Sequence, residues 1–252
     1  MGLKAITFDL WETIIIDDSD EPKRAAQGLR PKPEERRHLF WEALNRDAPI
    51  DRQLTDMAFA MQEHTFRFMW YEESITWEAS VRVDLMLKAL QRSLPESERA
   101  RLVTAFESME MQAPPDVIDG AKEVIADLAT RYKLCIISDT IYSSGRYLRD
   151  LLEHHGLKQH FSGFVFSDEA GHSKPHPDCF TKAALQLGIE FADMVHIGDR
   201  DPKDVDGAQA MGMKAILFTA SRDEGAGATT DADGIANSYT ELAAEIARLD
   251  AG

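Results

Sequence analysis

The chain has 252 residues, of which 44% are hydrophobic and 29% are charged, a composition typical of a globular protein with one large domain or two modest ones. Its formal net charge of −16 would repel phosphate backbones and anionic lipids, so we expect neither nucleic-acid nor membrane binding. The sequence has no apolar run long enough to span a membrane and no secretory signal pattern, which favours a cytoplasmic protein. Two cysteines are too few for a disulfide framework.

The first half of the chain changes character after one short strand. Residues 3–9 form an apolar run that ends in Asp9, which predicts a strand. Residues 14–32 are polar and contain proline and glycine, so we expect a loop there, with Arg24, Arg30 and Lys32 as a solvated basic stretch. Apolar residues spaced by three and four then predict four amphipathic helices, at 34–45, 55–71, 76–92 and 95–111.

The second half alternates between helical and strand patterns. Helices are predicted at 120–131, 143–155, 177–188, 202–211 and 239–249. Strands are predicted at 134–138, 163–167, 193–198 and 214–218, and residues 221–234 are predicted to form a mobile loop. This alternation predicts an α/β fold, a doubly wound parallel sheet with helices on both faces. The helical region would therefore interrupt the α/β part directly after its first strand.

Polar side chains follow the predicted strands at the ends where open parallel sheets bind ligands. Asp9 ends the first strand, Ser138 ends the second, Lys174 follows the third, and Asp199 and Asp204 follow the fourth. Each residue alone has an ordinary explanation, because aspartates at strand ends commonly form turns or cap helices. Taken together and in this order, they predict one site at a single rim of the sheet.

Four segments make the sequence resemble the haloacid dehalogenase-like hydrolase superfamily. They are the segments 8–13 (Phe-Asp-Leu-Trp-Glu-Thr), 136–140 (Ile-Ile-Ser-Asp-Thr), 173–177 (Ser-Lys-Pro-His-Pro) and 196–208, which contains Asp199 and Asp204. The resemblance covers residues 1–17 and 114–220. It implies a Rossmann-like core formed by 1–17 and 114–252, with an all-helical cap at 18–113. The linkers near 14–32 and 112–119 would act as hinges.

The resemblance also implies roles for the site residues. Asp9 would be the nucleophile that forms an aspartyl-phosphate, and Ser138 and Lys174 would contact the transferring phosphoryl group. Mg²⁺ would be held by Asp9, the backbone carbonyl of Trp11, Asp199 and Asp204, since hard oxygen ligands suit this ion. The amides of Leu10 and Trp11 would donate to phosphoryl oxygens, and Asp139 belongs to the substrate-binding segment.

Trp11 departs from the family pattern. Phosphatases of the family carry a second aspartate there, which protonates the leaving group, and indole cannot perform that chemistry. A first explanation is a substitute group: the adjacent Glu12, or one of the cap residues Glu63, His64, Glu72 and Glu73. A second is a leaving group that needs no proton, as in an acyl phosphate or a phosphonate labilised through an imine, for which Lys88 is the obvious interior lysine. A third is a protein that binds a phosphorylated ligand with little turnover.

The function predicted is a Mg²⁺-dependent hydrolase of a small phosphorylated metabolite. Haloacid dehalogenation is less favoured, although dehalogenases of the family also lack the second aspartate. That chemistry needs no metal, and Asp199 and Asp204 would repel a haloacid carboxylate. The sequence leaves open whether two copies pair as a homodimer through the helical cap.

Overall fold

The computed structural model describes residues 2–222 and 229–251. Its centre is a parallel sheet of six strands in the order β3-β2-β1-β4-β5-β6. The strands span Ala5–Phe8 (β1), Lys133–Ser138 (β2), Gly163–Phe166 (β3), Met194–Gly198 (β4), Lys214–Phe218 (β5) and Gly234–Ala236 (β6). Because β1 pairs with both β2 and β4, the chain reverses its direction of winding beside β1. The prediction of a doubly wound parallel α/β sheet is therefore confirmed. Because such a sheet binds ligands where the winding reverses, we expect the functional site at the rim beside β1.

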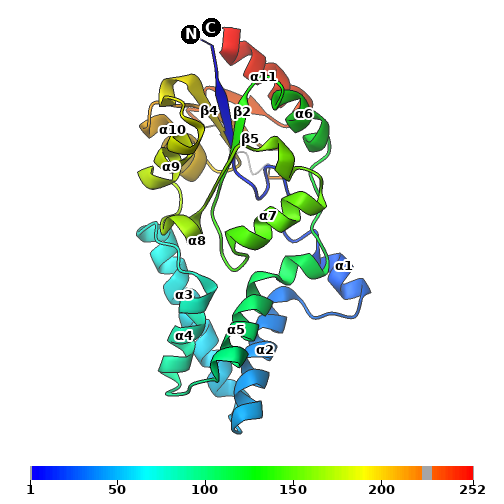
Figure 1. Cartoon of the computed structure of the whole chain (residues 1–252), viewed down its shortest axis with the longest axis vertical. Helices are drawn as coiled ribbons and strands as arrows, with labels where there is room; N and C mark the ends of the chain where they lie inside the picture. Colours follow the sequence, from blue (N-terminus) through cyan, green and yellow to red (C-terminus); the bar gives the residue numbers. More distant parts are fainter. Residues whose placement is uncertain (1, 223–228, 252) are drawn as a thin grey trace.

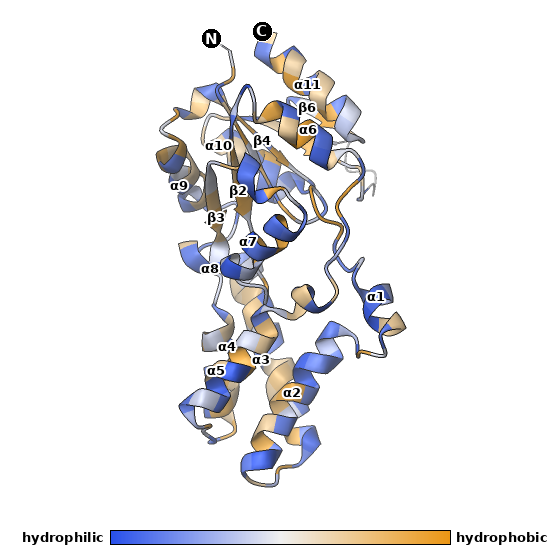
Figure 2. Cartoon of the chain, turned by 45° about the vertical axis from the view of Figure 1, so that its right-hand side comes forward, coloured by the Kyte–Doolittle hydropathy of each residue, from blue (hydrophilic) through white to orange (hydrophobic). Residues whose placement is uncertain are grey.

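Helices cover both faces of this sheet (Figure 1). Helices α6 (Ala121–Leu128), α7 (Gly145–His154) and α11 (Tyr239–Ala251) lie on one face, and α9 (Pro177–Leu187) and α10 (Asp206–Ala210) lie on the other. Side chains alternate along β1, so Ile6 and Phe8 join one apolar cluster and Ala5 joins the other. Figure 2 shows the consequence, apolar strands between helices that are apolar on one side only. The core is therefore divided into two layers by the sheet.

A helical block follows β1 and forms the lower part of the molecule in Figure 1. It consists of α1 (Glu21–Ala26), α2 (Lys32–Asp47), α3 (Arg52–Glu72), α4 (Ala79–Ala89) and α5 (Glu96–Glu107), followed by a 3₁₀ turn at Met109–Gln112. The block has its own apolar cluster, which includes Phe40, Phe59 and Phe106. Tyr142, from the loop after β2, is buried in the same cluster. The helical block therefore shares apolar packing with the α/β part.

The structure corrects several predicted elements. The segment 14–32 is not one loop, because it contains α1 and the first residue of α2. The predicted helix 202–211 begins as one π-helical turn at Asp201–Val205 before α10. The short helix α8 (Ser167–Ala170) and strand β6 have no counterpart among the predictions. Within the loop predicted at 221–234, residues 223–228 lie outside the described residues.

The described residues include no helix that is long and apolar enough to cross a membrane.

Candidate active site

The sheet brings the predicted site residues together at the carboxyl ends of its central strands. Asp9 directly follows β1, Ser138 is the last residue of β2, and Asp199 directly follows β4. Asp204 lies in the π-helical turn that comes next. Carboxylate oxygens of Asp9, Asp199 and Asp204 lie within 4.8 Å of one another, and all three residues are buried.

Lys174 lies among these carboxylates. Its Nζ is 2.8 Å from Asp9 Oδ1 and 2.5 Å from Asp204 Oδ1, and its side chain is 2% exposed. Burial opposes the charged form, but the carboxylates of Asp204 and Asp9 outweigh it and raise the pKa of Lys174. Burial raises the pKa of Asp9 above its usual range. The lysine is therefore a fixed cation that holds the proposed nucleophile in place.

His196 supports this arrangement from inside the sheet. Its Nε2 lies 3.1 Å from Asp204 Oδ1 and its Nδ1 lies 2.8 Å from Thr7 Oγ1. Burial lowers the pKa of His196, so the ring is neutral, its Nε2–H donates to Asp204, and Nδ1 accepts from the hydroxyl of Thr7. The sequence analysis gave His196 no role. The available signal was a polar residue in an otherwise apolar strand.

Gly198 leaves the space that Asp204 occupies. A Cβ at position 198 would lie 2.2 Å from Asp204 Cγ, so any larger residue would displace the carboxylate. The backbone N–H of Arg200 donates to Asp204 Oδ2 at 3.0 Å and fixes the other oxygen. The glycine is thus required by a close approach between the end of β4 and the side chain of Asp204.

The donor set fits a divalent cation. Burial first, and then the charges of Asp9 and Asp204, raise the pKa of Asp199 to about 8. Asp199 Oδ2 is buried without a hydrogen-bond partner among the described residues, although Arg222 Nε lies 3.2 Å away in a poor geometry. In the part of the chain that the structure describes, the buried Lys174 contacts Asp9 and Asp204, and Arg200 and Arg222 reach Asp199 from partly exposed positions. Clustered carboxylate oxygens of this kind suit Mg²⁺.

The other predicted ligand-binding residues differ in what they offer. The hydroxyl of Ser138, which is 2% exposed, donates to Asp139 O at 3.2 Å. The side chain of Leu10 is fully buried in the core. The N–H groups of Leu10 and Trp11 donate to no described residue, which leaves both available for an anion.

Asp139 connects two lysines. Its carboxylate accepts from the backbone N–H of Lys174 at 2.9 Å and from Nζ of Lys203 at 2.7 Å. The sequence analysis did not identify Lys203, and the available signal was its position beside Asp204 in the segment that follows β4. Asp139 therefore positions both lysines, and its contact with substrate stays a prediction.

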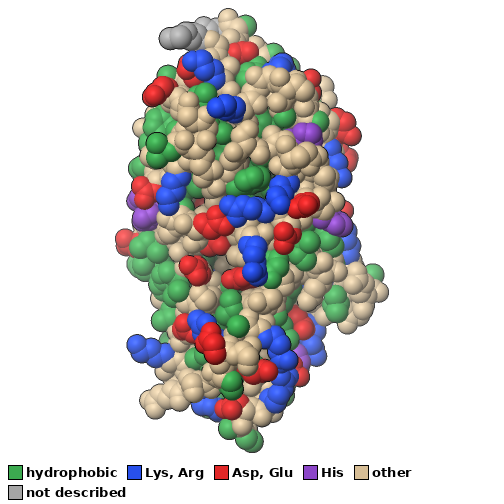
Figure 3. Space-filling view, viewed as in Figure 1, with side chains coloured by type: hydrophobic (Ala, Val, Ile, Leu, Met, Phe, Trp, Pro, Cys, Tyr) green, Lys and Arg blue, Asp and Glu red, His purple; other side chains and the backbone are tan. Residues whose placement is uncertain are grey.

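A cavity of about 320 Å³ opens above this site. Asp9, Trp11 and Lys174 line it from the α/β part, and the helical block contributes Lys32, Arg36, Glu63, Phe66, Arg67, Trp70, Tyr71 and Arg82. Figure 3 shows acidic and basic side chains gathered across the middle of the molecule, between the α/β part and the helices. The cavity is thus bounded by both parts of the chain.

The helical block also contacts the rim directly. Lys203 Nζ lies 3.4 Å from the centroid of the Trp70 ring, a cation–π contact. The hydroxyl of Ser173 donates to Trp70 O at 3.3 Å, and the N–H of Ser173 donates to Ser74 O at 2.8 Å. The end of α3 therefore covers the loop that carries Lys174 and the π-helical turn that carries Lys203.

The structure shows which of the groups considered as replacements for an acid at Trp11 line the cavity. Glu12 and Glu63 line the cavity, although Glu12 Oε1 accepts from the backbone N–H of Asp17 at 3.0 Å. The remaining carboxyl and imidazole groups considered, on His64, Glu72 and Glu73, are exposed and are not part of the cavity wall. The prediction that Lys88 is an interior lysine is wrong, because it lies on the exposed face of α4.

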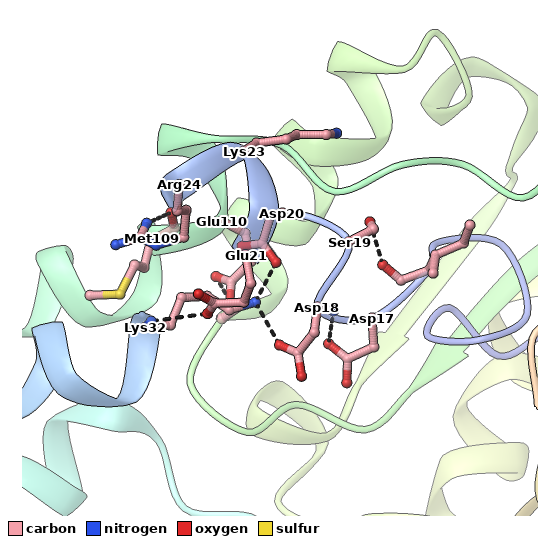
Figure 4. Close-up of polar contacts among 12 residues, drawn as sticks. Asp17, Asp18, Ser19, Asp20, Glu21, Lys23, Arg24, Lys32, Met109 and Glu110 are labelled. Carbon is pink, nitrogen blue, oxygen red and sulfur yellow. Dashed lines mark hydrogen bonds and ion pairs between the residues drawn. The ribbon is translucent and has the colours of Figure 1, made fainter. Parts of the chain in front are cut away.

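The linker before α2 carries a buried ionic network, drawn in Figure 4. Lys32 Nζ lies 2.8 Å from Asp20 Oδ1 and 3.2 Å from Asp18 Oδ1. Arg24 is fully buried and its Nε donates to Arg30 O at 3.1 Å. The expectation of a solvated basic stretch is therefore wrong for Arg24 and Lys32, because tertiary contacts bury both, and it holds for the exposed Arg30.

Comparisons with known proteins show what the chain is similar to as a whole. Residues 3–212 match the family model described as haloacid dehalogenase-like hydrolase. A Bos taurus protein named haloacid dehalogenase-like hydrolase domain-containing protein 3 is 36% identical over 40% of this chain, and the match spans 39% of the bovine protein. A Thermus thermophilus protein named phosphoserine phosphatase is 28% identical over 69% of this chain and 70% of its own length. In fold, the chain is similar to a 2-haloacid dehalogenase structure from Pseudomonas syringae, with a TM-score of 0.64, 21% identity and coverage of 98% and 99% of the two chains.

Proposed function

Because the chain belongs to the haloacid dehalogenase-like hydrolase family, we propose that it is a Mg²⁺-dependent hydrolase of a small phosphorylated metabolite, with Asp9 as the nucleophile. One observation carries the proposal. Asp9 is ion-paired with the buried Lys174 at 2.8 Å, and its carboxylate lies within 4.8 Å of those of Asp199 and Asp204. Dehalogenation at carbon has no use for the two additional carboxylates, whereas a metal-assisted phosphoryl transfer uses both. The similarity to a protein named phosphoserine phosphatase supports the same choice.

In this proposal Asp9, Asp199, Asp204 and the backbone carbonyl of Trp11 hold the ion. The carbonyl accepts no hydrogen bond from a described residue, so it is available as a ligand. When bound, Mg²⁺ neutralises charge and so permits an anionic phosphate to approach an anionic carboxylate. Lys174 adds a second, permanent positive charge at the same place.

The chemistry then takes two steps. A carboxylate oxygen of Asp9 attacks phosphorus, the new O–P bond forms, and the bond to the leaving oxygen breaks. The N–H groups of Leu10 and Trp11, the hydroxyl of Ser138 and the ammonium of Lys174 stabilise the phosphoryl oxygens. Water then attacks phosphorus in the aspartyl-phosphate, which releases inorganic phosphate and restores the carboxylate of Asp9.

The indole of Trp11 determines which substrates react fastest. An alkoxide leaving group needs a proton, and of the groups considered only Glu12 and Glu63 line the cavity. A phenolate or carboxylate leaving group departs without one. We therefore expect aryl and acyl phosphates to react faster than alkyl phosphates by about 10²-fold, the lower end of the range that general acid catalysis supplies.

The helical block serves as a cap in this proposal. Residues 18–113 would move relative to the core formed by 1–17 and 114–252, with the segments near 14–32 and 112–119 as hinges. The contacts of Trp70 with Lys203 and Ser173 would hold the closed arrangement.

The decisive experiment measures phosphate release from a panel of phosphorylated metabolites, with Mg²⁺ and then with excess EDTA. The proposal is supported if phosphate release depends on the metal and is abolished in Asp9→Asn. It is also supported if the wild-type protein, quenched in acid during turnover of a substrate with a radiolabelled phosphoryl group, retains the label. Full activity of Asp9→Asn would refute it.

Trp11 favours a second candidate, a protein that binds a phosphorylated ligand with little turnover. Thermal stabilisation by a panel member without phosphate release would support this candidate. Halide release from 2-haloacids that persists in EDTA would instead identify a dehalogenase.

A further inference from the structure

Arg82, on α4, is a buried cation in the wall of the same cavity as Asp9. It is 1% exposed, and its guanidinium carbon lies 4.0 Å from the centroid of the Phe66 ring and 3.6 Å from that of Tyr142. Burial lowers the pKa of Arg82 to about 10, so the side chain is still charged at neutral pH. Two aromatic rings therefore fix the plane of a charged guanidinium.

Within residues 2–222 and 229–251, Arg82 forms no ion pair. Its Nη1 donates to Ile141 O at 2.5 Å, and its Nε has no hydrogen-bond partner. The carboxylate of Glu63 influences Arg82 electrostatically, but it is paired with Arg37 at 3.3 Å. No described residue accepts a hydrogen bond of good geometry from Nη2 either, although the hydroxyl of Tyr142 is near enough to raise the pKa of Arg82 against the effect of burial. A guanidinium edge without a carboxylate partner is one that binds carboxylates.

The neighbouring buried cations already have counter-charges. Lys32 is paired with Asp20 at 2.8 Å, and Arg36 is paired with Glu110 at 3.3 Å. Of Lys32, Arg36 and Arg82, only Arg82 forms no ion pair with a carboxylate of the described chain. The hydroxyl of Tyr142 is also buried without a hydrogen-bond partner in the described chain.

A buried charge without a partner is costly, so its presence beside a cavity needs a counter-ion. A carboxylate matches the single charge of Arg82 and the planar edge of its guanidinium. A phosphate dianion would overcompensate one cation. This chemistry also differs from that of the Asp9 site, where the phosphoryl group would bind near the carboxylates and Lys174.

We propose that Arg82, with the hydroxyl of Tyr142, binds a carboxylate of the substrate, and that the substrate is a phosphorylated carboxylic acid. The inference rests on the proposed function, because the cavity that contains Arg82 also contains Asp9. A substrate bound in this cavity would place its phosphoryl group at Asp9 and its carboxylate beside Arg82 of α4.

This inference can be tested without turnover by measuring the binding of phosphonates, which the enzyme cannot hydrolyse, in pairs with and without a carboxylate. Calorimetry would compare phosphonoacetate, 3-phosphonopropionate and 4-phosphonobutyrate with the alkylphosphonates of equal length, in the presence of Mg²⁺. We expect the carboxylate to tighten binding by about 10- to 100-fold for the pair of the right length, the range of a charge-assisted hydrogen-bonded contact. In Arg82→Met, the ratio of the two dissociation constants within that pair should fall below about threefold.

Two further variants keep the test decisive. Arg99→Met removes an arginine of α5 that pairs with Asp84 at 2.5 Å outside the cavity, and it should leave the ratio unchanged. If Arg82→Met does not fold, Arg82→Lys carries the test, because lysine keeps the charge but lacks the planar edge. We expect it to lower the ratio at least fivefold.

The outcomes separate this inference from the proposed function. A wild-type protein that binds both members of every pair equally, or binds neither, overturns the inference, as does an Arg82→Met variant that keeps the preference. Phosphate release without a carboxylate preference refutes the inference alone. A carboxylate preference that depends on Arg82, without phosphate release from any ester, refutes the hydrolase and leaves the carboxylate site standing.

Discussion

Replacing Lys174 with methionine removes the buried cation that, among the described residues, contacts the carboxylates of Asp9 and Asp204. The side chain is 2% exposed, and its Nζ lies 2.8 Å from Asp9 Oδ1 and 2.5 Å from Asp204 Oδ1. Methionine has a similar length and would fill much of the space. The variant therefore leaves the buried carboxylates of Asp9, Asp199 and Asp204 facing one another without the lysine.

The expected loss in the free energy of unfolding follows from these distances. At an effective dielectric constant of about 20, a pair about 3 Å apart gains about 5 to 6 kcal/mol of Coulomb energy, which burial of the charges opposes. Removing one partner of a buried ion pair accordingly costs about 3 to 5 kcal/mol. We expect a loss of this size for Lys174→Met at pH 7.5 in EDTA.

The loss should depend on pH with a definite sign. Without the lysine, the folded-state pKa values of Asp9 and Asp199 rise further above their unfolded values, and the pKa of Asp204 is no longer lowered by Lys174. A carboxyl group with a raised pKa binds more protons in the folded state, so its contribution to stability is present at low pH and is lost as the pH rises through the folded-state pKa. The deficit of Lys174→Met should therefore shrink between pH 7.5 and pH 5.

Urea unfolding of both proteins at the two pH values checks this reasoning. Lys182→Met is the matched control, because Nζ of Lys182 donates to Ala170 O at 2.9 Å outside the site, and we expect it to lose less than about 1 kcal/mol. A loss below about 1 kcal/mol for Lys174→Met at pH 7.5, or a larger loss at pH 5 than at pH 7.5, would refute the reasoning.

Three further predictions concern the same site. Gly198→Ala should push aside the carboxylate of Asp204, because a Cβ at position 198 would lie 2.2 Å from Asp204 Cγ. The rate of phosphate release should then fall by about 10²-fold. An unchanged rate would contradict the close approach. Burial and the charges of Asp9 and Asp204 raise the pKa of Asp199 to about 8, so Mg²⁺ must displace the proton of Asp199 when it binds. The dissociation constant of Mg²⁺, measured by calorimetry, should therefore fall about tenfold per pH unit from pH 6 to 8 and level off above pH 8. A pH-independent affinity for Mg²⁺ would argue against this. Trp11→Asp should speed hydrolysis of alkyl phosphates by about 10²-fold and that of aryl phosphates much less; equal effects on both classes would mean that Trp11 does not limit protonation of the leaving group.

Much of the α/β part could be predicted from the sequence because its signals are local. Short apolar strands alternate with amphipathic helices, so the parallel sheet and the order of its elements follow from periodicity. Asp9, Ser138 and Asp199 stand at strand ends, and a parallel sheet necessarily brings such residues to one rim. The elements missed, α1, α8 and β6, are six, four and three residues long, too short to show a period.

Other features depend on contacts between distant segments. Arg24 and Lys32 have the local sequence of solvated residues, yet backbone carbonyls and Asp20 accept their hydrogen bonds inside the protein. Lys88 lies on a helix whose buried face could be placed only once its neighbours were known, and it is exposed.

The sequence by itself determined the sheet, the rim and the residues that carry the proposed chemistry, because periodicity and strand ends are properties of short segments. Only the tertiary structure decided how those residues are charged and what else surrounds them. Burial sets the pKa of Asp199, and His196 supports Asp204 from inside the sheet. Arg82 forms no ion pair within the described chain because Glu63 of the same cavity is paired with Arg37, a property of the folded cavity that no segment of sequence contains.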